Sequence, residues 1–258
     1  MRQQYFINKM AIGLTVVIMM ACAGPSQYEI NKQSESFREI GEAYMRQGNF
    51  TDALAELLKA EKLTPDDHIL QNDLGFCYLG KNRLDLSVLH LKRAIELKPD
   101  YAPAKNSLGV VYLKQKKWKK AITTFKEITD NLLYATPHYP LSNLGEAYFN
   151  LGDLDQAEYY FMEALKRKPN FHNALRGLGQ TYLKKNRPKD AIYYLEKALE
   201  TAPNSAPIYF DLANAYQSVQ DQKRSIHAFE KVLELAPNSA IAKRSELALY
   251  HMTGKRRY

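Results

Sequence analysis

The sequence of 258 residues predicts an all-α solenoid in which six pairs of helices stack one after another. Leucine-glycine with a tyrosine three residues after the glycine occurs four times, about every 34 residues. A small residue and then leucine or phenylalanine follow each glycine at fixed distances, and proline closes five of the six units. A period of about this length is typical of stacked two-helix repeats.

The first 22 residues have the composition of a targeting segment. Residues 1–9 carry Arg2 and Lys9 without an acid, and residues 10–21 are apolar or small, a length too short to span a bilayer comfortably. Cys22 then follows Ala21. This arrangement resembles a bacterial lipoprotein signal, which implies cleavage before Cys22 and acylation of its thiol. The alternative is an uncleaved anchor helix that contains a cysteine by chance.

The residues after Cys22 indicate which membrane would hold the protein and how far from that membrane the repeats could lie. Ala23 stands where an aspartate commonly retains such lipoproteins in the inner membrane, so the resemblance implies the periplasmic face of the outer membrane. Residues 23–33 are polar and lack apolar periodicity. We therefore expect residues 22–33 to be a lipidated cysteine with a flexible tether, reaching at most about 40 Å.

Each repeat is expected to be two antiparallel helices. Glycine or alanine in the first helix lets the second approach closely, and proline ends the second because it cannot continue a helix. An amphipathic helix over residues 240–252, stopped near Gly254, is expected to cap the stack, followed by a basic tail to residue 258. The expected repeats cover residues 34–67, 68–101, 102–137, 138–171, 172–205 and 206–239.

These positions resemble the tetratricopeptide repeat over residues 34–239. The resemblance implies a right-handed superhelix whose first helices line a concave face. Positions 2, 5, 9 and 12 of each repeat share one side of that helix. In repeats two to four they predict a largely apolar partner-binding groove formed by Ile69, Asn72, Phe76, Leu79, Asn106, Val110, Leu113, Tyr139 and Phe149. The same positions are polar or charged at Arg38, Glu42, Ser142, Glu146, Asn173, Arg176 and Gln180.

Two alternatives stay open for this groove. Position 12 can pack inside the repeat, which would make its leucines core residues instead. Repeat three also has two extra residues, with Ile128 and Leu133 where alanine and proline are expected. The turn at Leu133, Tyr134 and Pro137 is then either a tolerated insertion or a projecting partner site.

The composition favours a binding protein without chemistry of its own. The formal net charge of +8 is spread along the chain, and no nucleic-acid-binding module accompanies it, so we expect solvated helix faces and no nucleic-acid partner. The sequence contains no P-loop, HExxH or GxSxG motif, and its six histidines do not form a metal-ligand pattern. We expect no enzyme activity, cofactor, metal or small-molecule substrate, and a buried thiol at Cys77.

The whole chain resembles the type IV pilus biogenesis/stability lipoproteins, which are pilotin-like proteins. The most specific part of the resemblance is residues 131–152, "NLLYATPHYPLSNLGEAYFNLG". It implies a protein partner, the outer-membrane secretin, and membrane attachment through the N-terminal lipid. The alternatives are an envelope adaptor that docks peptidoglycan hydrolases or proteases, and a component of a polysaccharide-export or other secretion system.

Overall fold

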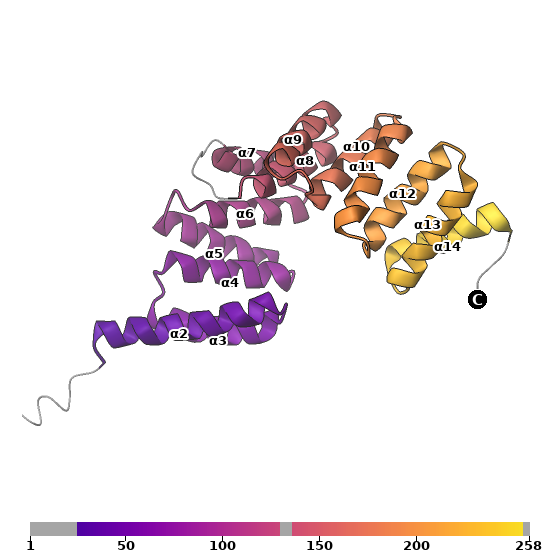
Figure 1. Ribbon diagram of the computed structural model, residues 1–258. Coiled ribbons are helices and arrows are strands. Elements are labelled where there is room, and N and C mark those ends of the chain that lie inside the picture. Colours follow the sequence, from indigo (N-terminus) through magenta and orange to yellow (C-terminus); the bar gives the residue numbers. More distant parts are fainter. Residues whose placement is uncertain (1–24, 130–135, 255–258) are drawn as a thin grey trace, which may run out of the picture. The chain divides into compact units, whose positions relative to one another are not determined.

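The structure is a computed structural model that describes residues 25–129 and 136–254. Within these ranges the chain forms thirteen helices and no strand (Figure 1). Cys22, Leu133 and Tyr134 lie outside the described residues, so the lipidation site and most of the irregular turn stay predictions. In the described part of the chain, every helix is too short or too polar to serve as a membrane span.

The chain divides into two compact units, residues 1–104 and 105–258. The helices of the first unit are α2 (Gln27–Arg46), α3 (Phe50–Leu63), α4 (His68–Gly80) and α5 (Leu84–Leu97). The boundary falls inside α6 (Ala102–Lys114). The second unit continues with α7 (Trp118–Thr129), α8 (His138–Leu151), α9 (Leu154–Arg167), α10 (His172–Lys184), α11 (Pro188–Thr201), α12 (Ala206–Ser218), α13 (Gln222–Leu235) and α14 (Ala240–Thr253).

Neighbouring helices pack in pairs, and the pairs pack on one another. The tightest pairs are α2 with α3, α4 with α5, α8 with α9, α10 with α11, and α12 with α13. Within each unit, the second helix of a pair contacts the first helix of the next, as α3 contacts α4 and α9 contacts α10. The first helices begin at residues 68, 102, 138, 172 and 206, where repeats two to six were expected to start, and α14 begins at 240. The predicted all-α repeat architecture is confirmed.

Within a pair, the two helices approach so closely that the first has no room for a side chain at the crossing point. A Cβ atom on Gly75 would lie 2.5 Å from Cγ of Leu91, and one on Gly145 would lie 2.7 Å from the Phe161 ring. Ser87, at the small-residue position of α5, donates a 2.7 Å hydrogen bond to the Gly75 carbonyl, so its buried hydroxyl is satisfied. The crossing thus combines a glycine with a large apolar partner.

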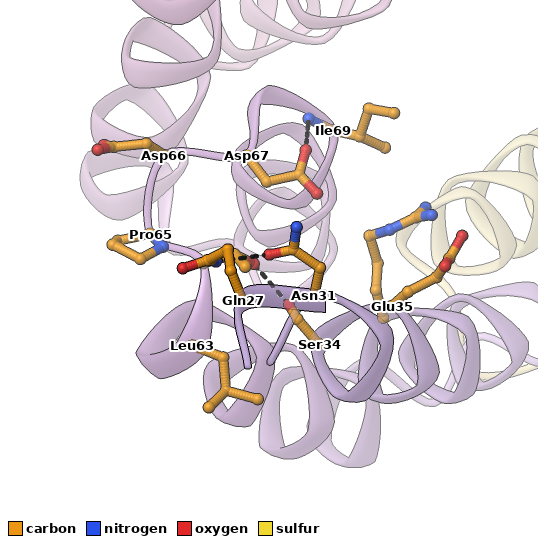
Figure 2. A pocket seen from close by; sticks show the side chains of 11 residues that line it. Gln27, Asn31, Ser34, Glu35, Leu63, Pro65, Asp66, Asp67 and Ile69 are labelled. Carbon is orange, nitrogen blue, oxygen red and sulfur yellow. Dashed lines mark hydrogen bonds between the residues drawn. The ribbon is translucent and has the colours of Figure 1, made fainter. Parts of the chain in front are cut away.

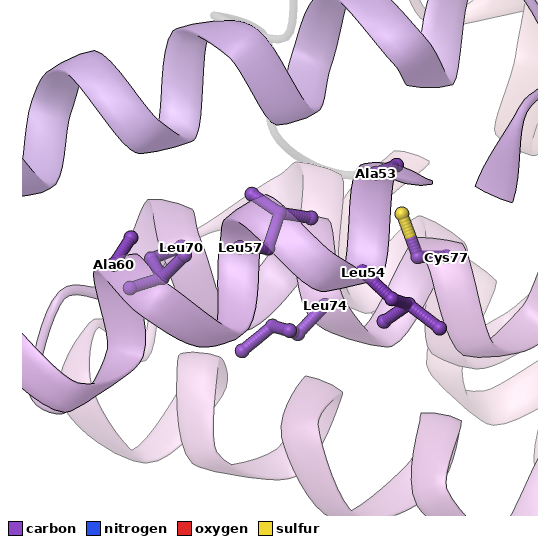
Figure 3. Packing of buried hydrophobic residues seen from close by; sticks show 7 residues of the cluster. All are labelled: Ala53, Leu54, Leu57, Ala60, Leu70, Leu74 and Cys77. Atoms are coloured by element: carbon purple, nitrogen blue, oxygen red, sulfur yellow. The ribbon is translucent and has the colours of Figure 1, made fainter. Parts of the chain in front are cut away.

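The core of the first unit lies between α3 and α4 (Figure 3). Its members are buried and apolar: Ala53, Leu54, Leu57, Ala60, Leu70, Leu74 and Cys77. Burial raises the pKa of the Cys77 thiol to about 12, which keeps it protonated at neutral pH. The expectation of a buried, unpaired thiol is confirmed.

Helix α2 begins earlier than the sequence pattern indicated. Ser26 is its N-cap and accepts a hydrogen bond from the Glu29 amide, while the Glu29 carboxylate accepts one from the Ser26 amide at 2.8 Å. This capping box satisfies two amides that a helix start otherwise leaves unpaired. The prediction of a flexible tether is therefore wrong for residues 27–33, which are helical.

We predict that Gly75→Val destabilises the first unit by about 1–3 kcal/mol, because the new side chain must displace Leu91. Thermal unfolding followed by circular dichroism measures the loss. Leu91→Ala opens space at the same point and costs about 2–5 kcal/mol alone. The double variant should then lose less than the sum of the two changes. Additive losses would contradict a direct contact at this crossing.

Candidate functional site

Two cavities lie beside the first helices of the repeats, one in each unit. The cavity of the second unit has a volume of about 420 Å³ and lies between α8 and α10, with the Phe161 ring of α9 contributing to its wall. Its lining is mostly polar: Ser142, Asn143, Glu146, Phe149, Asn150, Phe161, Asn173, Arg176, Gly177 and Gln180. Six of these residues occupy positions 2, 5, 9 or 12 of their repeats. The positions expected to line a groove therefore do line a cavity here, and its walls are more polar than those of the predicted groove.

Opposite charges are arranged along this cavity. Nε of Arg176 lies 2.6 Å from Oδ2 of Asp211 on α12, and Nε2 of Gln180 donates to the same oxygen at 2.9 Å. Burial raises the pKa of the Asp211 carboxyl, and Arg176 opposes that shift. Desolvation by its neighbours also raises the pKa of Glu146, although the residue is exposed, and Arg176 and Lys114 oppose that shift. Amide, hydroxyl and paired charged groups of this kind suit the backbone and polar side chains of a peptide.

The contact between α10 and α12 belongs to a pattern that recurs between repeats. Position 6 of one repeat faces positions 5 and 9 of the repeat before it. Asp211 at position 6 receives Arg176 and Gln180, and Asn143 at position 6 donates to Oδ1 of Asn106 at 3.3 Å. We call this contact the inter-repeat clasp. It joins the first helices of neighbouring repeats by polar groups.

In the first unit the clasp is incomplete. Asp73 on α4 holds position 6, and Arg38 and Glu42 on α2 hold positions 5 and 9. The Arg38 guanidinium pairs with Glu42 on its own helix. Among the described residues, none donates to Oδ2 of Asp73 or to Oδ1 of neighbouring Asn72, although both atoms are buried.

Asp73 consequently carries an unusual carboxyl group. Its side chain is buried, with 7% of the residue exposed, and its Oδ1 accepts one hydrogen bond, from Asn72 at 3.2 Å. Burial, followed by the negative charge of Glu42, raises the pKa of Asp73 to about 7. The Asn72 hydrogen bond and Arg38 oppose the shift without cancelling it.

The first unit has a cavity of its own beside α2 (Figure 2). It has a volume of about 620 Å³ and lies between α2 and the turn from α3 to α4. Its lining combines α2 side chains with that turn: Gln27, Asn31, Ser34, Glu35, Arg38, Leu63, Thr64, Pro65, Asp66, Asp67 and Ile69. Asn31 and Ser34 line the cavity from α2, and Gln27 in the first turn of α2 extends the same wall.

The predicted groove residues are divided between the two units and differ in exposure. Phe76 is 40% exposed and Tyr139 44%, whereas Leu79 and Leu113 are each only 8% exposed. The half-buried residues are Ile69, Asn72, Asn106, Val110 and Phe149. Position 12 therefore packs inside the repeat at Leu79 and Leu113, which are core residues and not groove residues.

Two further predicted residues have identified contacts. The Phe149 ring lines the cavity of the second unit and has Nζ of Lys184 4.8 Å from its centre. Pro137, predicted as part of the irregular turn, is the N-cap of α8. Partner binding at any of these residues stays a prediction.

Sequence reasoning missed position 6 altogether. It considered only the positions expected to face the groove, and position 6 faces the neighbouring repeat. The available signal was aspartate beside the leucine of the repeat motif, as in Asp73-Leu74 and Asp211-Leu212. An acid between apolar helix residues indicates either a paired charge or a ligand contact.

Comparison with known proteins gives the family. A tetratricopeptide repeat profile matches residues 38–102, 78–132 and 142–206, and a second profile of the same repeat matches residues 182–246. The chain belongs to the tetratricopeptide repeat family. No curated protein matches this tetratricopeptide repeat chain in sequence. In the described part of the chain, no three histidine, cysteine, aspartate or glutamate side chains converge to hold a metal ion.

Solved tetratricopeptide repeat structures share the fold. PilW, described as a widely conserved type IV pilus biogenesis factor, is 20% identical over 82% of this chain and 97% of its own, with a TM-score of 0.74. pilF of Pseudomonas aeruginosa is 17% identical over 85% and 99%, with a TM-score of 0.71. YrrB, described as having an unusual peptide-binding site, is 18% identical over 74% and 97%, with a TM-score of 0.52.

We predict that Asp73→Asn stabilises the protein at pH 8 and has little effect near pH 4. The folded-state pKa of about 7 lies above the usual aspartate value, so the native state binds the extra proton and stability falls as pH rises from about 4 to 7. Above pH 7 the cost of burying the ionised Asp73 carboxylate is fully present. The uncharged amide of the Asp73→Asn variant removes about 2–4 kcal/mol of that cost. Chemical denaturation at both pH values measures the difference.

The matched control is Glu96→Gln, which removes an exposed helical carboxylate of the same unit. It should change stability by less than about 0.5 kcal/mol at either pH. Equal effects of Asp73→Asn at pH 4 and pH 8 would contradict a buried carboxyl group that titrates near neutrality.

Proposed function

We propose that this protein is a lipid-anchored, non-enzymatic scaffold that assists assembly of the outer-membrane secretin in type IV pilus biogenesis. The observation that carries the proposal is the extent of the structural match. The shared fold covers 97% of PilW, which is described as a type IV pilus biogenesis factor, and 99% of pilF. A tetratricopeptide repeat protein acts through protein–protein contacts, so the partner is a protein.

The proposed mechanism joins an anchor to a binding surface. Acylation of Cys22 would confine the repeats to the periplasmic face of the outer membrane. Confinement raises the effective concentration of the repeats near membrane-bound partners without any new contact. The polar cavities beside α2 and α10 then offer hydrogen-bonding groups to a partner segment.

We predict that Phe76→Ala weakens partner binding while leaving the fold intact, because its ring is 40% exposed on α4. Leu79→Ala, three residues later, removes a buried side chain and should destabilise the first unit by about 2–5 kcal/mol. Circular dichroism melting measures stability, and co-purification with the secretin measures binding. If Phe76→Ala co-purifies with the secretin as well as the wild-type protein does, Phe76 is not part of the partner-binding surface.

Deletion of the gene in its native bacterium should abolish heat-resistant secretin multimers in the outer-membrane fraction. The wild-type gene should restore them, whereas Cys22→Ala should restore them poorly because the repeats lose their anchor. Blotting of membrane fractions measures both results. Unchanged multimers in the deletion strain would overturn the pilus role and direct attention to envelope hydrolases, proteases or export machinery as partners.

A further inference from the structure

The connection between α6 and α7 in the second unit carries a dense cluster of positive charge. Five of the seven residues at positions 114–120 are lysines, and all five are exposed: Lys114, Lys116, Lys117, Lys119 and Lys120. Trp118, the only tryptophan of the chain, lies half-buried among them. We call residues 114–120 the lysine turn.

The helices that flank the lysine turn offer it almost no negative charge. The only acid in residues 105–129 is Glu127, and its Oε2 lies 2.8 Å from Nζ of Lys105. Two lysines of the turn have partners, since Lys114 acts on the Glu146 carboxyl and Lys120 lies over an aromatic ring of α6. The side chains without an ion pair, hydrogen bond or ring contact among the described residues are those of Lys116, Lys117 and Lys119.

The equivalent turn of repeat five is neutralised within the chain. Between α10 and α11, Nζ of Lys185 lies 2.5 Å from Oδ1 of Asp155 and 2.6 Å from Oε2 of Glu158. Nε of Arg187 lies 2.7 Å from Oδ2 of Asp190. The repeat fold therefore allows cations at this turn to be paired internally. The exposed positive charge of the lysine turn is a feature of its own sequence.

Lys116 has a backbone conformation that lysine seldom adopts. Its φ is +57°, in the left-handed region that favours glycine and asparagine. The equivalent residue is Gln220 in repeat six, and in the other four repeats it is Gly48, Asn82, Gly152 or Asn186. A lysine at this position costs conformational free energy. The turn thus carries a cation against its backbone preference, which points to a role for the charge.

We propose that the lysine turn docks on the surface of a bilayer that contains anionic phospholipids. Lysine side chains reach charged headgroups through flexible apolar stems, and an indole ring such as that of Trp118 suits the boundary between headgroups and acyl chains. The cluster contains no arginine. Because arginine is preferred for bidentate recognition of a defined carboxylate, five lysines favour a diffuse anionic surface over an acidic protein segment.

This inference goes beyond the proposed function, which gives the protein an N-terminal anchor but no contact between its repeats and lipid. The choice of a bilayer rests on the proposed membrane location, whereas the positive surface rests on the residues of the turn alone. Docking would attach the second unit to the membrane through a contact of its own. Since this contact is electrostatic and exposed, salt should weaken it.

The test uses the native fluorescence of Trp118 in the full chain, reconstituted in two kinds of vesicle. One kind contains phosphatidylcholine alone, and the other contains two parts phosphatidylcholine to one part phosphatidylglycerol. In both, the phosphatidylcholine is brominated near the headgroup and quenches an indole on contact. We expect quenching only with phosphatidylglycerol. It should disappear at about 1 M salt, where the Debye length falls to about 3 Å.

The triple variant Lys116→Gln, Lys117→Gln and Lys119→Gln locates the contact. Each lysine near an anionic surface strengthens binding by about five-fold, so loss of three should weaken docking by about a hundred-fold. Quenching should then fall to the level seen with phosphatidylcholine alone. Gln220 has the same left-handed backbone as Lys116, so glutamine fits this position.

The matched control is Lys189→Gln with Lys223→Gln and Lys243→Gln. It removes the same charge from exposed positions of the same unit and should leave the quenching unchanged. Circular dichroism melting establishes that both triple variants are folded.

Equal quenching in the two kinds of vesicle, or quenching that survives in the Lys116, Lys117 and Lys119 variant, would overturn the proposal. An equal loss in the control would also overturn it, because the attraction would then come from net charge. A fluorescence change with soluble polyglutamate but none with anionic vesicles would replace the bilayer by an acidic protein segment. Loss of secretin multimers on gene deletion, without lipid-dependent quenching, would refute this inference and leave the proposed function standing.

Discussion

The close contact between a glycine and a large apolar side chain is the constraint on which this structure depends. In five of the six repeats, a glycine of the first helix lies against leucine or phenylalanine of the second, as Gly41 lies against Leu57 and Gly109 against Phe125. This contact fixes the distance between the paired helices. Because neighbouring pairs within a unit then pack on one another, it also fixes which side chains of successive first helices meet there.

The inter-repeat clasp is formed at equivalent positions of the repeats, but its polar groups are not satisfied equally in all of them. A complete clasp, as at Asp211, satisfies its polar groups within the protein and stiffens the junction between two repeats. An incomplete clasp, as at Asp73, leaves a buried carboxylate oxygen without a donor among the described residues. Repeats that share one pattern of glycine and apolar residues can therefore differ in the polar contacts between them, and the difference depends on two or three side chains.

The fold could be read from the sequence because its main contacts are local and periodic. Glycine, a small residue and a proline at fixed spacing located the helix starts at residues 68 to 240. The site was harder to predict. Leu79 lies at a groove position yet is buried by its own repeat. The state of Asp73 depends on Arg38 of the preceding repeat, which pairs with Glu42 on its own helix. The early start of α2 rests on a capping box rather than on apolar periodicity.

That early start has a consequence for movement at a membrane. With Ser26 as the N-cap of α2, four residues separate Cys22 from the first helical residue, and fully extended they span about 14 Å. The expected tether would have reached about 40 Å, so the volume searched by the anchored end shrinks roughly twenty-fold. Under the proposed lipid anchor, the start of α2 therefore stays within about 14 Å of the anchored cysteine, so the first repeat is held close to the bilayer surface.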